Sequence, residues 1–565
     1  MTLDPITLEV VLNRIREIAA NMEHALYHSG YSSILRESQD GTAGLADAEG
    51  NVVLVSGGLQ YHVLPCSQAI RCVLRRYPRE RMREDDSFVV NDPHRAGNPH
   101  VPDMVAVTPV FYRGRLVAFG VSIAHKVDLG GLVPGSSGSA AREIFHDGLL
   151  LPAVRYWTRD GVNEEVEAII RNNSRVPDVV IGDLRGQVGC TRLAVEAIGR
   201  LADEYGIDTV LESMSRLLAG TARQLEDELE RWPDGATEAE GFLDHDGADK
   251  SRPIRVHVRV AKSGRKLSLD FSGSDAQARG PVNVNAATAQ AVSLLATLAA
   301  VDPGIPMNSG LTRVVEFVLP EGRVVNPRFP ATVNLYFPTA HLVYNCVLAA
   351  LGKLNPERAV APSGLGSGAI AIGYPRARSG KPAVQYELLN TSLGGGSGHD
   401  GATAVMAMNH FTPSSPVEII ESEYPIRVRR FDIVADSAGA GRWRGGTGIV
   451  REYEMLEDCM VTVRGSNHRH AAWGLAGGAS PAPARAVLNP GTAREEALDI
   501  LESREMKKGD VLQLQQSGGA GYGDPRERLR SLVEEDVANG YVSAGAAGGI
   551  YGLQASRRDR SESGS

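Results

Sequence analysis

Residues 98–128, NPHVPDMVAVTPVFYRGRLVAFGVSIAHKVD, are the stretch on which our interpretation of the fold depends. Apolar runs of strand length lie on either side of the polar residues 112–115, YRGR, and this pattern predicts a β-hairpin that turns there. Folded in this way, the hairpin brings Asp103 opposite His125, to within one residue. Facing residues of antiparallel strands have Cβ atoms roughly 4.5–5.5 Å apart.

A third polar residue, His100, lies just before the hairpin. It follows Pro99 and precedes Val101 and Pro102, so we expect it on a stiff loop and not on a helix. Two imidazoles and one carboxylate can therefore meet at one end of a sheet. His100, Asp103 and His125 would then form a three-ligand metal site with open positions, as catalytic sites require. The alternative is that these are ordinary surface or hydrogen-bonded residues at strand ends.

The length and composition predict several domains. The chain has 565 residues, which is too long for one ordinary core, and 42% of them are hydrophobic, which is typical of a globular protein. A charged, glycine-containing segment near residues 233–251 is the predicted boundary. We therefore expect a metal-binding catalytic domain over residues 1–240, a second α+β region over 241–555, and a disordered tail over 556–565.

Hydrophobic periodicity predicts an α+β fold with mixed or antiparallel sheets flanked by helices. From about residue 365 to 525 the chain is dense in glycine and in short apolar runs, which predicts a glycine-rich β region. Helical patterns cover residues 5–35, 62–76, 182–231, 285–302 and 338–352, and strand patterns cover 40–60, 253–275 and 310–335.

Charge and cysteine content exclude several classes of protein. The net charge is −9 and only the last residues are rich in arginine, which argues against nucleic acid or an anionic membrane as a partner. The five cysteines form no C-x-x-C pair, and residues 1–5, MTLDP, lack the charged and apolar regions of a signal peptide, so we expect no signal peptide and a reduced, cytoplasmic protein. No apolar run reaches the ~18–20 residues that span a bilayer. There is no P-loop motif, so any ATP is expected to bind another chain.

Eight motifs resemble one known family. Residues 91–103, NDPHRAGNPHVPD, are similar to the N-D-P-x-x-G-x-x-x-x-x-D signature of the hydantoinase B/oxoprolinase family. One departure is Lys126, which follows His125 where relatives commonly have a second histidine. The resemblance continues, in order along the chain, in residues 124–131 (AHKVDLGG), 305–310 (IPMNSG), 327–331 (PRFPA), 412–418 (TPSSPVE), 423–425 (EYP), 442–446 (RWRGG) and 517–525 (SGGAGYGDP).

This resemblance implies an ATP-dependent enzyme of two subunits. In the family, an A-type subunit with an actin-like ATPase fold activates the substrate, and the B-type subunit holds a divalent metal and completes the reaction. The implied activity here is the opening of a cyclic amide, such as a hydantoin, oxoproline or lactam ring, in a heterotetramer or larger complex. The implied metal ligands are His100, Asp103 and His125, with Asp40 as a fourth ligand or a base. Sites of two histidines and one carboxylate accept Mn, Zn or Fe.

Five further residues are candidates for supporting roles. Asp40 or Asp128 could accept a proton or brace a ligand histidine; for Asp128, a turn aspartate before two glycines is an equal alternative. His62, His146 and His399 are candidates for substrate binding. The alternatives are a packed histidine for His62 and a turn residue for His399.

Two other functions stay open at this point. The chain could be a subunit of an ATP-dependent carboxylase of the acetone or acetophenone type, which would consume bicarbonate as a substrate. It could also be a non-catalytic scaffold for the ATPase partner, although an intact set of His100, Asp103 and His125 argues against that.

Overall fold

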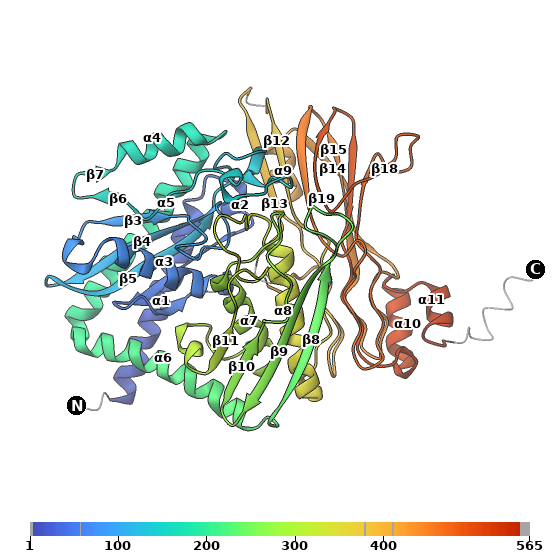
Figure 1. Ribbon diagram of the computed structural model, residues 1–565, viewed down its shortest axis with the longest axis horizontal. Coiled ribbons are helices and arrows are strands. Elements are labelled where there is room, and N and C mark those ends of the chain that lie inside the picture. The colour runs from blue at the N-terminus through green and yellow to red at the C-terminus, as the bar shows by residue number, and fades with distance from the viewer. Residues whose placement is uncertain (1–3, 57, 378–379, 409–411, 554–565) are drawn as a thin grey trace, which may run out of the picture.

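The computed structural model describes residues 4–56, 58–377, 380–408 and 412–553 (Figure 1). The predicted tail over residues 556–565 lies outside the described residues. None of the helices in the described ranges is long and apolar enough to cross a membrane.

The N-terminal part is a seven-stranded antiparallel sheet covered on both faces. Its strand order is β2-β1-β5-β4-β3-β6-β7. Helices α1 and α5 pack on one face of the central strands, and α3 packs on the other. The strands are β1 (Gly41–Asp47), β2 (Val52–Val55), β3 (Ser87–Val90), β4 (Asp103–Tyr112), β5 (Arg115–His125), β6 (Val154–Thr158) and β7 (Gly161–Val162). The helices are α1 (Pro5–His28), α2 (Ser33–Arg36), α3 (Val63–Arg76), α4 (Glu164–Asn173), α5 (Pro177–Tyr205) and α6 (Ile207–Glu230).

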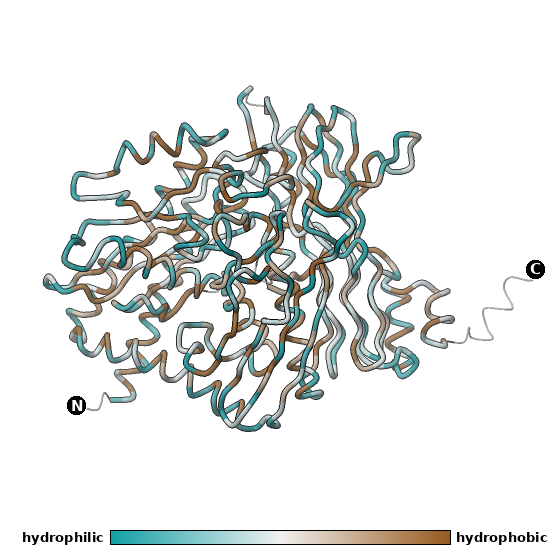
Figure 2. The backbone as a smooth tube through the Cα atoms, in the orientation of Figure 1, coloured by the Kyte–Doolittle hydropathy of each residue, from teal (hydrophilic) through white to brown (hydrophobic). Residues whose placement is uncertain are grey.

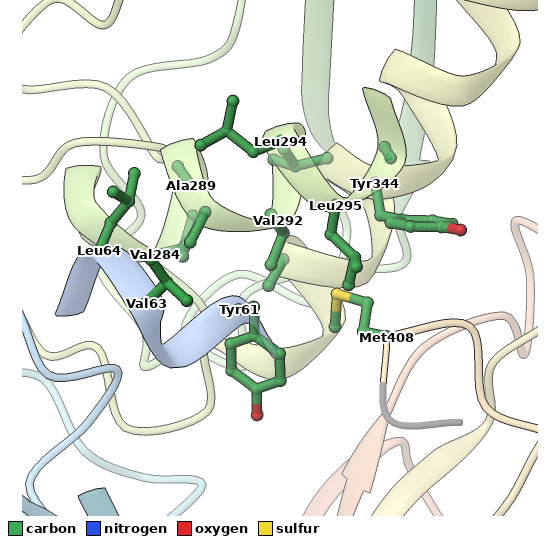
Figure 3. Close-up of a cluster of buried hydrophobic side chains, with 14 of the residues drawn as sticks. Tyr61, Val63, Leu64, Val284, Ala289, Val292, Leu294, Leu295, Tyr344 and Met408 are labelled. Atoms are coloured by element: carbon green, nitrogen blue, oxygen red, sulfur yellow. The ribbon is translucent and has the colours of Figure 1, made fainter. Parts of the chain in front are cut away.

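The middle part is a four-stranded sheet against which two apolar helices lie. The order is β11-β10-β9-β8, and only the β10–β11 pair is parallel. Helix α8 packs on β8 and β9, and α7 packs on α8 and on α3. Figure 3 shows apolar side chains of α7 meeting Val63 and Leu64 of α3, with the Tyr61 hydroxyl pointing away from them. These elements are β8 (Gly235–Leu243), β9 (Ile254–Ser263), β10 (Lys266–Asp270), β11 (Val315–Val318), α7 (Ala286–Val301) and α8 (Phe337–Leu354).

The C-terminal part is a pair of packed sheets followed by two short helices. Strands in the order β13-β12-β16-β19 face strands in the order β14-β15-β20-β17-β18 across one hydrophobic cluster. The strands are β12 (Ser367–Tyr374), β13 (Ala383–Leu388), β14 (Ile426–Val434), β15 (Gly448–Met455), β16 (Cys459–Gly465), β17 (Arg485–Leu488), β18 (Glu496–Ala497), β19 (Leu501–Met506) and β20 (Val511–Gln515). The helices are α9 (Val417–Glu423), α10 (Arg530–Ala538) and α11 (Ala544–Gly549).

The predicted α+β class with mixed and antiparallel sheets is confirmed. Apolar residues gather along the strands and the inward helix faces, while peripheral loops are hydrophilic (Figure 2). One helix prediction was too long, because the first helix ends at His28. The helical stretch expected over 182–231 is present, but as two helices that meet at Gly206, whose φ of +81° is left-handed. Strands expected over 310–335 reduce to β11.

The proposed division at residue 240 stays a prediction. The largest hydrophobic cluster contains residues from both sides of this division, such as Val105 and Val256, and strand β8 spans residue 240.

Candidate metal centre

The site is built on the predicted hairpin, and a bulge sets its register. Arg113 and Gly114 have φ values of +50° and +77°, as a tight two-residue hairpin turn requires. Val117 is left unpaired, because Phe111 faces Leu116 whereas Val110 faces Ala118. From there to the far end of the hairpin every pair is shifted by one residue, and Asp103 faces His125.

This shift decides which side chains meet. Without the bulge, Asp103 would face Ala124, and His125 would point to the other face of the sheet. The sequence predicted the facing pair to within one residue, and the structure places His125 directly opposite Asp103.

His100 lies on a loop that buried asparagines hold in place. Asn91 donates to the carbonyl oxygens of Val101 and Leu149 at 2.8 and 2.9 Å, and Asn98 donates to the His100 carbonyl oxygen at 2.7 Å. The His100 ring is oriented by its Nδ1, which lies 2.8 Å from the Asn334 carbonyl oxygen. Its Nε2 is thereby turned toward Asp103, 3.3 Å from Oδ2.

His100, Asp103 and His125 converge on one point. Each offers one ligand atom, and these atoms all lie within 4.8 Å of one another. All three residues are at most 3% exposed, and neither ring nitrogen of His125 has a hydrogen-bond partner. A buried imidazole without hydrogen-bond partners costs folding free energy unless a ligand binds to its ring nitrogens. Two histidines and one carboxylate are the donor set of many catalytic metal sites, so the residues fit a divalent ion.

The protonation states of these groups suit ligation. Burial lowers the pKa of His125 well below its ordinary value. Burial alone would raise the pKa of the Asp103 carboxyl, but His100, His125 and His62 lower it to about 2. A neutral imidazole and an ionised carboxylate are the forms that bind a metal.

Asp40 shares a small cavity with these residues. The cavity has a volume of about 30 Å³, and Tyr61, Asn334, Tyr336, Tyr386 and Arg464 complete its polar lining. That volume is enough for about two or three water molecules. The backbone carbonyl of Asp40 accepts from the His125 amide at 3.1 Å, so the two residues are held side by side. Burial, and then the charge of Asp103, raise the pKa of the Asp40 carboxyl well above its usual range.

Asp128 lies outside the cavity and anchors a loop. Its carboxylate accepts from the backbone amides of Gly130, Gly135 and Arg175 at 3.0, 2.9 and 2.9 Å, and pairs with the Arg175 guanidinium at 3.0 Å. These contacts match the alternative of a turn aspartate, so we carry only Asp40 forward as a proton-transfer candidate.

The three other predicted histidines do not line the cavity. His62 is buried beside it, with Nδ1 3.2 Å from the Thr42 hydroxyl, and burial lowers its pKa to about 4. The half-buried His146 accepts from the Arg142 amide through Nδ1 at 3.1 Å. His399 is exposed, with Nδ1 3.1 Å from the Asp400 carbonyl oxygen. Their roles in substrate binding stay predictions.

None of the five other polar residues of the lining was expected from the sequence, and the most distant of them along the chain are Arg464 and Tyr386. They come from β16 and β13 of a C-terminal sheet, far along the chain from the hairpin. The Tyr386 ring lies 4.2 Å from the His125 ring, and the Arg464 guanidinium lies 4.6 Å from the centre of the Tyr386 ring. No local motif marks either residue.

Comparison with known proteins agrees with this architecture. Residues 4–525 match the family model of hydantoinase B/oxoprolinase. The chain belongs to this family. The B-type subunit of a putative D-/L-hydantoinase from Pseudomonas sp. (strain NS671) is 30% identical over 98% of this chain and 95% of its own length.

Two solved structures of similar fold extend the comparison. The crystal structure of the ATP-dependent caprolactamase from Pseudomonas jessenii has a TM-score of 0.91 and 27% identity, and the match covers 99% of this chain and 98% of that one. A nucleotide-free acetone carboxylase structure has a TM-score of 0.90 over 98% of this chain and 80% of that one. Its identity of 19% shows a shared fold alone.

Proposed function

We propose that this member of the hydantoinase B/oxoprolinase family is the B-type subunit of an ATP-dependent, metal-assisted amidohydrolase. Its substrate would be a cyclic amide, such as a hydantoin, oxoproline or lactam ring. The observation that carries the proposal is the buried convergence of His100, Asp103 and His125, with both His125 nitrogens unpartnered, beside a cavity. The full-length similarity to the B-type subunit of a putative hydantoinase and to an ATP-dependent caprolactamase supports the substrate class.

The roles of the residues follow from their positions. His100, Asp103 and His125 would hold a divalent ion, Mn, Zn or Fe, with His100 fixed in orientation by the Asn334 carbonyl. When bound, such an ion supplies Lewis-acid polarisation and lowers the pKa of water beside it. Asp40 would take a proton from the attacking water and return it to the ring nitrogen as the amide bond breaks.

The size of the cavity limits what enters it. A volume of about 30 Å³ is smaller than a cyclic amide, so only the reacting part of the substrate would reach His100, Asp103 and His125, and most of the ring would remain outside. An unactivated cyclic amide is a poor electrophile. Activation is assigned to an A-type ATPase partner, because this sequence carries no P-loop motif.

The test combines metal content with turnover. Purified wild type, His100→Ala and His125→Ala would be compared by elemental analysis, and then assayed with the A-type partner, ATP and a set of cyclic amides. We expect near-stoichiometric metal and ring opening in the wild type, and neither in the variants. A folded wild type that takes up no Mn, Zn or Fe would refute metal assistance.

The same assay separates the hydrolase from the two other functions. Turnover that consumes bicarbonate would identify a carboxylase. Full activity of the complex after loss of His100 and His125 would identify this chain as a scaffold for its partner.

A further inference from the structure

Arg464 differs from the other buried arginines of the chain. Across the described ranges four arginines are less than 10% exposed, and three of them form ion pairs. Arg464 has no carboxylate within 4.0 Å among the described residues. The three paired arginines are Arg444 with Asp536, Arg451 with Glu387, and Arg528 with Asp400 and Asp536.

The Arg464 guanidinium faces the metal-site cavity with spare hydrogen-bond donors. A guanidinium has five N–H groups. Among the described residues, Arg464 donates one hydrogen bond, from Nη1 to the Ser137 hydroxyl at 3.1 Å. The Tyr386 hydroxyl, in the lining of the same cavity, is also buried without a partner. A buried cation without a counter-charge and a buried hydroxyl without a hydrogen-bond partner both cost folding free energy. Because the two lie at one place, they indicate a ligand that would pair with both.

The charge of the cavity points to an anion. A divalent ion and Arg464 bring three positive charges, against one negative charge on Asp103 and at most one on Asp40. The site would therefore be net positive when loaded. The planar guanidinium fork matches the paired oxygens of a carboxylate or phosphoryl group.

We propose that Arg464 and Tyr386 form a subsite for an anionic oxygen group of the substrate, next to His100, Asp103 and His125. The inference rests on the proposed function for the reaction, but the subsite itself can be tested without turnover. Two sources share this chemistry: a carboxylate carried by the cyclic amide, and a phosphoryl group added to it during activation.

The first experiment measures anion binding by calorimetry. Inorganic phosphate and acetate would be titrated into metal-free and Mn-loaded protein, for the wild type, Arg464→Gln and Tyr386→Phe. The control variant is Arg504→Gln, which removes a half-exposed arginine of the neighbouring strand β19. We expect one anion per chain in the wild type, binding about 10- to 150-fold weaker in Arg464→Gln, and no change in the control. Arg464→Lys should restore part of the affinity, because it keeps the charge but loses the fork.

Three outcomes decide against the subsite. If the wild type binds neither anion in either form, or if Arg464→Gln binds both as the wild type does, the proposal is overturned. It is also overturned if Arg464→Gln remains folded but loses its Mn, since Arg464 would then act by keeping the metal ligands in place, through Tyr386 and the Ser137 loop.

Kinetics then separates the two sources. If the anion is a carboxylate of the substrate, Arg464→Gln raises KM for acid-bearing cyclic amides and leaves neutral ones unchanged. If it is a transferred phosphoryl group, kcat falls by a similar factor for both kinds. Anion binding that depends on Arg464, in a protein that opens no cyclic amide, would sustain the subsite and refute the proposed function alone.

Discussion

Replacing His125 by leucine tests the metal site through the sign of a stability change. Both ring nitrogens of His125 are buried without partners. An unpaired buried polar group costs about 1–3 kcal/mol, and leucine fills a similar space without that cost. In metal-free protein we therefore expect His125→Leu to be as stable as the wild type or more stable. With metal at 100 times its dissociation constant, the wild type gains about 2.7 kcal/mol and the variant gains nothing from this site.

The expected shift in melting temperature follows from the chain length. Unfolding entropy is about 2.1 cal/mol/K per residue, so 565 residues give about 1.2 kcal/mol/K, and 1–3 kcal/mol corresponds to about 1–3 °C. Scanning fluorimetry on chelator-dialysed and Mn-supplemented protein resolves this difference. The order of the two proteins should reverse between the two conditions.

A second buried histidine provides the control. His341 on α8 is also buried, but its Nε2 lies 3.0 Å from the Ser363 hydroxyl and its Nδ1 lies 3.4 Å from the Asn345 amide nitrogen. His341→Leu should lower the melting temperature equally with and without metal. If His125→Leu behaves in the same way, His125 is a packed histidine and the reasoning is refuted.

Four more substitutions probe the site and its supports. Asp40→Asn should retain metal but lower kcat about 100-fold or more if Asp40 transfers a proton, as elemental analysis and steady-state rates would show. Asp128→Ala should also retain metal. It should lower the melting temperature by about 2–4 °C, because the Arg175 guanidinium loses its ion pair and two glycine amides lose their hydrogen-bond acceptor. Loss of metal in this variant would contradict a turn role for Asp128. Burial raises the pKa of the Asp147 carboxyl in the folded protein well above the ordinary value of 3.8. The stabilisation that comes from keeping this carboxyl protonated is therefore complete below pH 3.8 and is lost as the pH rises toward the folded-state pKa. Asp147→Asn should therefore gain melting temperature relative to the wild type between pH 5 and pH 8. Asp536→Ala breaks buried pairs with two arginines at a cost of about 3–5 kcal/mol, and hydrogen exchange should show α10 and α11 opening first.

The hairpin was predictable because its information is local. The polar residues 112–115 between two apolar runs specify a turn, and turn geometry sets the pairing. The bulge at Val117 was not predictable, because Leu116, Val117 and Ala118 are ordinary strand residues. A bulge depends on how the strand packs against its neighbours, and here it determines that His125 faces Asp103.

Arg464 was missed for a different physical reason. Residues 461–464, VTVR, alternate apolar and polar, which predicts one buried face and one solvated face. Val461 and Val463 do pack into the core between the two C-terminal sheets. Thr462 and Arg464 are nevertheless 1% and 9% exposed, because the loop around Ser137 covers the face that would otherwise be solvated. Only the tertiary arrangement converts that polar face into the wall of a cavity.

The two halves of the site therefore have separate origins in the chain. The three candidate metal ligands lie within 26 residues, on one hairpin and its leading loop, whereas Tyr386 and Arg464 come from a sheet more than 200 residues later. Substitutions in β13 and β16 can thus change which anionic group is accepted and leave His100, Asp103 and His125 in place. Metal content and substrate preference should then vary independently. A variant that alters both at once would have acted through the contact that joins the halves, the Tyr386 ring against the His125 ring.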